Sequence, residues 1–151
     1  MSNRLLQWAM RWQVPAAALD ELMSMDDIDD SGTVGPSEMS VLKKCRLQAD
    51  VLGGVLWRNN SGATFDKNGR MIRYGLGNDS KKLNRDYKMP DLVGIRRDGR
   101  FWSAEIKRPG WSGVSNDREK AQANAGRHIE SLGGLFTFAT DPAHITEMMN
   151  R

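Results

Sequence analysis

The chain has 151 residues, of which 39% are hydrophobic and 27% are charged, and its formal net charge is +3. These values fit one globular domain with a small appendage and exclude a disordered or collagen-like chain. No apolar run reaches the ~18 residues that span a bilayer, the first residues show no secretory signal pattern, and Cys45 is the only cysteine. We therefore expect a cytoplasmic protein without disulfides and without a membrane partner.

The small net charge hides an uneven distribution along the chain. Residues 1–38 carry two basic and seven acidic side chains, whereas residues 39–151 carry 20 basic and 12 acidic ones. A basic main body is typical of proteins that bind polyanions such as nucleic acids, although an ordinary basic surface gives the same count.

Residues 1–36 are predicted to form a helical extension and an acidic linker. Apolar residues recur at helical spacing between Leu5 and Met25, interrupted at Val14–Pro15, which predicts two short helices. An acidic linker follows. Ser37 then suits the N-cap of a third helix, which Gly53–Gly54 end.

From residue 55 onward, the hydrophobic pattern predicts strands interspersed with helices. The strands are expected at 55–60, 70–76, 91–97, 101–107 and 135–139. The helices are expected at 117–132 and from Pro142 onward. Turns at 67–69 and at Asp98–Gly99 join strands as hairpins, and a polar, basic connection covers 78–88. This order predicts an α/β domain over residues 37–151, with a central mixed sheet flanked by helices.

Two acids and a lysine in the middle of the chain form a pattern that suits phosphodiester hydrolysis. Asp91 begins one predicted strand, and Glu105 and Lys107 lie two apart on the next, so their side chains share a face. The Asp98–Gly99 turn pairs these strands and can bring Asp91 and Glu105 together. Two carboxylates suit a hard divalent cation, and a neighbouring lysine can stabilise the transition state or orient water. A turn cap at Asp91 and a surface pair between Glu105 and Lys107 would explain the same residues without chemistry.

The pattern Pro90-Asp91…Glu105-Ile106-Lys107 resembles the core motif of the PD-(D/E)xK nucleases. Within that superfamily the chain resembles the VRR-NUC branch, in particular the stand-alone forms encoded by phages and prophages. The resemblance covers about residues 37–139 and rests on further segments: SEMSVLKKCRLQADVLGGVLWRNNSGA, RYGLGNDSKKLN, KRPGWSG and REKAQANAGRHIESLGGLFTFA. It implies a restriction-endonuclease-like core, metal-dependent cleavage of DNA in a bacterial host cell, a preference for branched or junction DNA, and a homodimer.

The same resemblance implies roles for individual residues. Lys107 matches the catalytic lysine, and Gln122 matches a glutamine that lies beside the catalytic site on the following helix. Asp91 and Glu105 match the catalytic acids. The implied ligands of Mg²⁺ or Mn²⁺ are Glu38, Asp91, Glu105 and the backbone carbonyl of Ile106.

Basic side chains surround this pattern in the sequence. Contacts between several of them and phosphates would make DNA binding depend steeply on salt. Trp111 lies in a glycine-rich loop and is a candidate for stacking on unpaired bases. The candidate DNA contacts are Arg58, Lys81, Lys82, Arg85, Lys88, Arg108, Trp111 and Arg118.

Residues 27–38 carry a different metal signal, because their spacing resembles an EF-hand calcium loop. The ligand positions of that loop fall on Asp27, Asp29, Ser31, Thr33 and Glu38. EF-hands usually work in pairs and only one such loop is present, and an acidic linker explains the same residues. The alternatives to a nuclease are therefore a catalytically inactive DNA-binding module and a Ca²⁺-binding interaction protein.

Overall fold

A computed structural model describes residues 10–15, 18 and 37–151 of the chain. Its helices are α3 (Glu38–Val51), α4 (Lys81–Asp86), α5 (Asp117–Ser131) and α6 (Ala143–Met149). Its strands are β1 (Val55–Arg58), β2 (Gly62–Phe65), β3 (Met71–Tyr74), β4 (Leu92–Ile95), β5 (Phe101–Ile106) and β6 (Leu135–Ala139). The acidic turn at 26–36 and most of the two predicted N-terminal helices lie outside the described residues.

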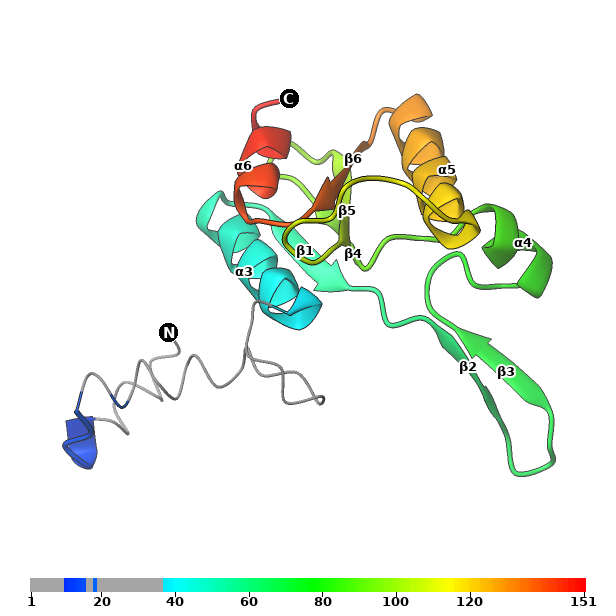
Figure 1. Cartoon of the computed structure of the whole chain (residues 1–151), viewed down its shortest axis with the longest axis horizontal. Coiled ribbons are helices and arrows are strands. Elements are labelled where there is room, and N and C mark those ends of the chain that lie inside the picture. Colours follow the sequence, from blue (N-terminus) through cyan, green and yellow to red (C-terminus); the bar gives the residue numbers. More distant parts are fainter. Residues whose placement is uncertain (1–9, 16–17, 19–36) are drawn as a thin grey trace.

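The fold is α/β, with a mixed sheet in the order β1-β4-β5-β6 and helices on both of its faces (Figure 1). Strands β1, β4 and β5 are antiparallel to their neighbours, whereas β6 runs parallel to β5. The predicted hairpin around Asp98–Gly99 joins β4 to β5. No helix in the described part of the chain combines the length and the apolar character that a membrane span requires.

The three helices predicted after residue 36 are confirmed as α3, α5 and α6, and side-chain caps begin the first two. The Ser37 side chain accepts a hydrogen bond of 3.1 Å from the backbone N–H of Ser40 at the start of α3. Asn116 accepts one of 3.0 Å from the N–H of Glu119 at the start of α5. The short helix α4 was not predicted, because its sequence is polar and only the cap at Ser80 distinguishes it from a loop.

The strand pairing differs from the sequence prediction in one place. The turn expected at 67–69 is present, but it joins β3 to β2, a strand that was not predicted. Strand β1 instead pairs with β4 in the central sheet. The reason lies in burial: β1 contributes the buried Leu56 to the core, whereas neither β2 nor β3 contains a buried residue.

The alternation of side chains along β5 divides the interior into two layers. Trp102, Ala104 and Ile106 belong to the apolar core that the sheet forms with α3 and α6. The intervening side chain of Glu105, and Lys107 just after the strand, contact α5 on the opposite face. Two ionisable side chains are therefore buried between the sheet and α5.

Candidate functional site

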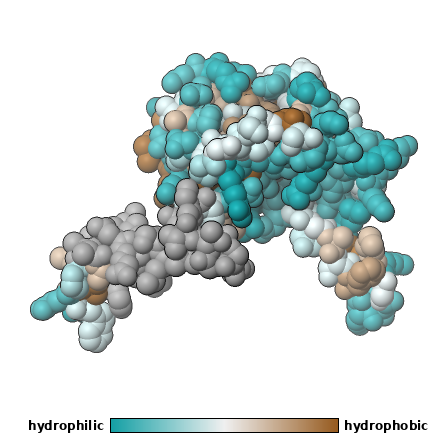
Figure 2. All heavy atoms as spheres, in the orientation of Figure 1, coloured by the Kyte–Doolittle hydropathy of each residue, from teal (hydrophilic) through white to brown (hydrophobic). Residues whose placement is uncertain are grey.

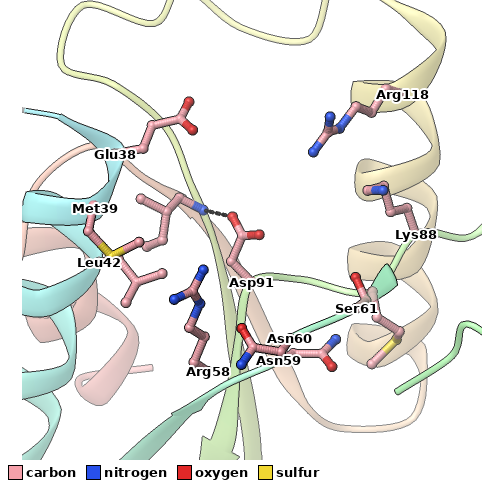
Figure 3. A pocket seen from close by; sticks show the side chains of 12 residues that line it. Glu38, Met39, Leu42, Arg58, Asn59, Asn60, Ser61, Lys88, Asp91 and Arg118 are labelled. Atoms are coloured by element: carbon pink, nitrogen blue, oxygen red, sulfur yellow. Dashed lines mark hydrogen bonds between the residues drawn. The ribbon is translucent and has the colours of Figure 1, made fainter. Parts of the chain in front are cut away.

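Two adjoining cavities of about 240 Å³ each open at one edge of the central sheet, the edge that is formed by the ends of its strands. At this edge β1 and β5 end and β4 begins, as the pairing of Leu92 with both Arg58 and Ala104 requires. Both cavities are lined by Glu38, Asp91, Ile106 and Arg118, which come from α3, the start of β4, the end of β5 and α5. Figure 3 shows Glu38, Asp91 and Arg118 around one of the two cavities. We call the two cavities together the edge cleft.

Asp91 projects into the edge cleft and is held there by backbone contacts. Its Oδ2 atom accepts a hydrogen bond of 3.1 Å from the N–H of Ile106, marked by the dashed line in Figure 3. The backbone N–H of Asn59 donates to the Asp91 carbonyl at 2.7 Å, and the Asn59 side chain donates to the Pro90 carbonyl at 3.2 Å. The position of this carboxylate is therefore set by both neighbouring strands of the sheet.

Glu105 is buried in the wall of the cleft, with 2% of its surface exposed. Its Oε1 atom accepts hydrogen bonds from the Gln122 amide and from Lys107, whereas its buried Oε2 atom has no hydrogen-bond partner. Burial, and after it the negative charge of Asp91, raises the pKa of Glu105 to about 8. A buried carboxylate oxygen without a partner is costly, and in native proteins it calls for a proton, a water molecule or a cation.

The Lys107 ammonium group lies beside Glu105 and is enclosed by polar and aromatic groups. Its Nζ atom donates to Gln122 Oε1 at 2.9 Å and to Glu105 Oε1 at 3.4 Å. The Glu119 carboxylate lies 3.8 Å from the same atom. The Trp111 ring centroid lies 5.9 Å away, within the range of cation–π attraction. Lys107 is thus held in one place by contacts from several directions.

Glu119 belongs to this cluster, although the sequence analysis did not select it. Its carboxylate accepts hydrogen bonds from the Ser115 backbone N–H at 2.7 Å, from the Trp111 indole at 2.9 Å and from the Ser115 hydroxyl at 3.0 Å. These bonds, the Ser115 backbone one first, lower the pKa of Glu119 to about 2. Glu119 could have been selected from the sequence, because the spacing from Asn116 to Glu119 is that of a capping box at the start of a helix. Gln122 follows one turn later on the same helix face.

Trp111, a candidate for stacking on DNA bases, has partners within the protein. Its ring packs on Phe138 with the centroids 4.6 Å apart, and its indole N–H is bonded to Glu119. In this structure Trp111 supports the groups around Lys107.

The candidate DNA contacts divide into those that line the cleft and those that do not. Arg58, Lys88 and Arg118 line one of the two cavities together with Asp91 (Figure 3). Burial, and after it the positive charge of Arg118, lowers the pKa of Lys88. The remaining basic candidates lie outside the lining of both cavities, three on α4 and one just after β5: Lys81, Lys82, Arg85 and Arg108.

The cleft contains the kind of oxygen donors that Mg²⁺ and Mn²⁺ use. Asp91, Glu105 and Glu38 all line it, and Glu105 Oε2 is buried without a partner. As the side chains stand, the described residues include no cluster of three or more His, Cys, Asp or Glu groups with the geometry to hold a metal. Of the predicted calcium loop, Asp27, Asp29, Ser31 and Thr33 lie outside the described residues. Its last position, Glu38, lines the edge cleft.

Comparisons with protein-family models, with curated proteins and with solved structures find no match for this chain. The resemblance to the VRR-NUC nucleases therefore remains a prediction from sequence motifs.

Proposed function

We propose that the chain is a divalent-metal-dependent nuclease, with a restriction-endonuclease-like core, that hydrolyses DNA phosphodiesters in the edge cleft. The observation that carries this proposal is the buried Oε2 atom of Glu105, which has no partner and lies in a cleft that Asp91 and Lys107 also line. Buried charged groups contribute little net stability, because apolar residues of similar volume stabilise a core as well or better. The buried Glu105 carboxylate is therefore better explained by a role in metal binding and catalysis than by a contribution to packing.

Glu105 and Asp91 would hold a Mg²⁺ or Mn²⁺ ion, with Glu38 and the carbonyl of Ile106 as further ligands. Such an ion, when bound, lowers the pKa of a coordinated water and offsets the negative charge of a phosphate group. The N–H of Ile106 already orients Asp91. One residue at the end of β5 would therefore orient one ligand through its N–H and supply another through its carbonyl group.

Lys107 stabilises the negative charge that develops on the phosphate, or positions the attacking water, through its ammonium protons. Gln122 and Glu119 hold this ammonium group in place before the substrate binds. A donor fixed in advance costs no reorganisation during the reaction, and this is the main source of electrostatic catalysis. Gln122 acts as a positioning residue, because it touches both Lys107 and Glu105.

The cations of the cleft define the expected substrate. Arg58, Lys88 and Arg118 line the cleft beside Asp91, where they can contact the phosphates that flank the scissile bond. The motif resemblance adds branched or junction DNA as the preferred structure and a homodimer as the acting form. Both are parts of the proposal.

The decisive experiment is a cleavage assay on end-labelled single-stranded, duplex, flap and four-way-junction DNA. Each DNA is incubated with Mg²⁺, Mn²⁺, Ca²⁺ or EDTA. We expect cleavage with Mg²⁺ or Mn²⁺, none with EDTA, and a loss of about 100-fold or more in Lys107→Ala. Lys44→Ala is the matched control, because Lys44 is exposed on α3 and lines neither cavity. DNA binding without cleavage in every metal would contradict the proposal and leave an inactive DNA-binding module.

Metal binding can be measured separately from activity by calorimetric titration with Mn²⁺. We expect Glu105→Gln to weaken or abolish binding, because an amide oxygen is a poorer ligand than a carboxylate. Glu130→Gln, which changes an exposed acid near the far end of α5, is the control. Equal Mn²⁺ affinity in wild type and Glu105→Gln would show that Glu105 is not a ligand.

A further inference from the structure

The β2–β3 hairpin stands apart from the body of the protein as an arm (Figure 1). The two strands pair only with each other, and neither contains a buried residue. An isolated two-stranded hairpin is marginally stable in water. The conformation of the arm therefore depends on contacts at its base and on whatever partner covers it.

Apolar side chains gather on this arm in a way that is unusual for a solvent-exposed segment (Figure 2). Four large side chains on it are between 45% and 65% exposed: Phe65, Met71, Ile72 and Tyr74. Phe65 pairs with Met71 next to the turn, so these two share one face, and Ile72 and Tyr74 point to the other. A partner that covers both faces must surround the arm.

The arm is also positively charged. Residues 62–74 contain three basic side chains and one acid, Asp66. Asp66 is used within the turn, where its Oδ1 atom accepts hydrogen bonds of 2.8 Å from the N–H groups of Asn68 and Arg70. A second copy of the arm would bring like charges together, whereas a polyanion would be attracted. A polyanion that also offers apolar faces is a nucleic acid with exposed bases.

The base of the arm is tied to the edge cleft. The Asn78 amide donates to the Gly62 carbonyl at 2.7 Å and to the Tyr74 carbonyl at 2.9 Å, and so holds both strands at once. Asn59 accepts a hydrogen bond of 2.9 Å from the N–H of Leu76, and its own N–H donates to the Asp91 carbonyl. Asn59 thus links the segment that follows β3 to the backbone of Asp91, whose side chain lines the cleft.

We propose that the β2–β3 hairpin is a DNA-binding arm: Phe65 and Met71 pack against exposed bases near the cut, while Lys67 and Arg70 contact phosphates. This inference rests on the proposed function, because it assigns the arm to the same DNA that the cleft would cut. A regular duplex hides the faces of its bases by stacking, whereas a branch point or a single-stranded stretch exposes them. The arm therefore favours DNA whose bases are unpaired or unstacked beside the scissile phosphate.

The test measures DNA binding and cleavage in parallel on the full chain. Fluorescence anisotropy in EDTA gives the affinities for a single strand, a duplex and a duplex with a flap, each at several salt concentrations. The arm variants are Phe65→Ala/Met71→Ala and Lys67→Gln/Arg70→Gln, which change exposed residues only. The matched controls are Leu132→Ala and Arg97→Gln, two exposed residues that follow α5 and β4 and do not line the edge cleft.

We expect the apolar double variant to bind single-stranded and flap DNA about tenfold or more weakly, with a smaller change on duplex. The charge double variant should weaken binding to all three DNAs. It should also reduce the slope of log affinity against log salt by about 1.4–1.8, the amount expected for two lost phosphate contacts. Both controls should bind like wild type.

The outcomes separate this inference from the nuclease proposal. If both arm variants bind every DNA like wild type, the arm is not a DNA-binding element, whatever the cleavage assay shows. If the arm variants lose binding as expected while wild type cuts no DNA in any metal, the DNA-binding role of the arm is supported and the nuclease proposal fails. If wild type sediments as a dimer and Phe65→Ala/Met71→Ala as a monomer with unchanged DNA affinity, the arm pairs with a second copy and the inference is wrong.

Discussion

Gln122 accepts a hydrogen bond of 2.9 Å from Lys107 Nζ, between helix α5 and the end of strand β5. Through its amide nitrogen, the same side chain donates to Glu105. One neutral residue therefore sets the positions of the acid and the lysine relative to each other. Because these two groups lie in the edge cleft with Asp91, the geometry of the proposed site depends on how α5 packs on the sheet.

Replacing Gln122 should reduce cleavage more than it reduces DNA binding. Residues that orient catalytic ligands typically contribute about 10–100-fold to activity, and we expect a loss of that size in kcat for Gln122→Ala. The affinity for DNA should change little, because Gln122 is fully buried and cannot touch the substrate. Single-turnover cleavage and anisotropy measurements on the same DNA give the two numbers. Glu130→Ala on the same helix is the control, and equal losses of rate and affinity would contradict a positioning role.

The stability of the metal-free protein should fall as the pH rises from about 4.5 to about 8. The pKa of Glu105 is about 8 in the folded chain and near its ordinary value when unfolded. The folded state therefore binds more protons in this window, and stability decreases as they are released. Urea unfolding in EDTA at pH 5.5, 7 and 8.5 measures the effect.

Glu105→Gln is the matched variant for this prediction, because the amide keeps the shape of the side chain and removes its titration. We expect it to flatten the pH dependence and to stabilise the metal-free chain at pH 8.5. Mn²⁺ should stabilise wild type but not the variant. The same pH dependence in both proteins would show that another group is responsible.

The sequence was most informative where local rules determine the structure. The Asp98–Gly99 turn sets the register of β4 and β5, and this register brings Asp91 to the N–H of Ile106. Strand alternation places Glu105 and Lys107 on one face, and their 3.4 Å contact confirms that placement. The placement of Gln122 beside them followed from the resemblance, and the structure brings it into contact with both.

Features that depend on long-range packing were not predictable in the same way. The indole of Trp111 is directed by Glu119 and Phe138, two partners that no local pattern associates with it. Strand β2 was missed because its four residues have almost no apolar pattern, and it exists through pairing with β3 and the contacts of Asn78. Hydrophobic periodicity arises where one face of an element is buried, and the exposed β2–β3 arm has no buried face.

Trp111→Phe should destabilise the protein while leaving its affinity for DNA nearly unchanged. The change removes the indole donor to Glu119 but keeps a ring against Phe138. We expect the melting temperature to fall by a few degrees, because a buried carboxylate loses one of its hydrogen bonds. Trp111→Ala should lower it further, since Phe138 also loses its neighbour. If Trp111→Ala melts like wild type but binds single-stranded DNA more weakly, the ring stacks on bases and the structural interpretation is wrong.

Asn78→Ala should loosen the β2–β3 arm without unfolding the body of the protein. The side chain of Asn78 is buried and donates to one carbonyl on each strand, while its Oδ1 atom accepts from Arg73 at 2.8 Å. Leaving such groups without partners costs about 1–3 kcal/mol, so amide exchange over residues 62–74 should be about tenfold faster or more. Hydrogen-exchange mass spectrometry measures this, with the amides of α5 as the internal reference. Asn68→Ala, at the tip of the turn, should leave exchange at the base of the arm unchanged. A uniform increase along the whole chain would mean that Asn78 stabilises the entire fold and is not a local clamp on the arm.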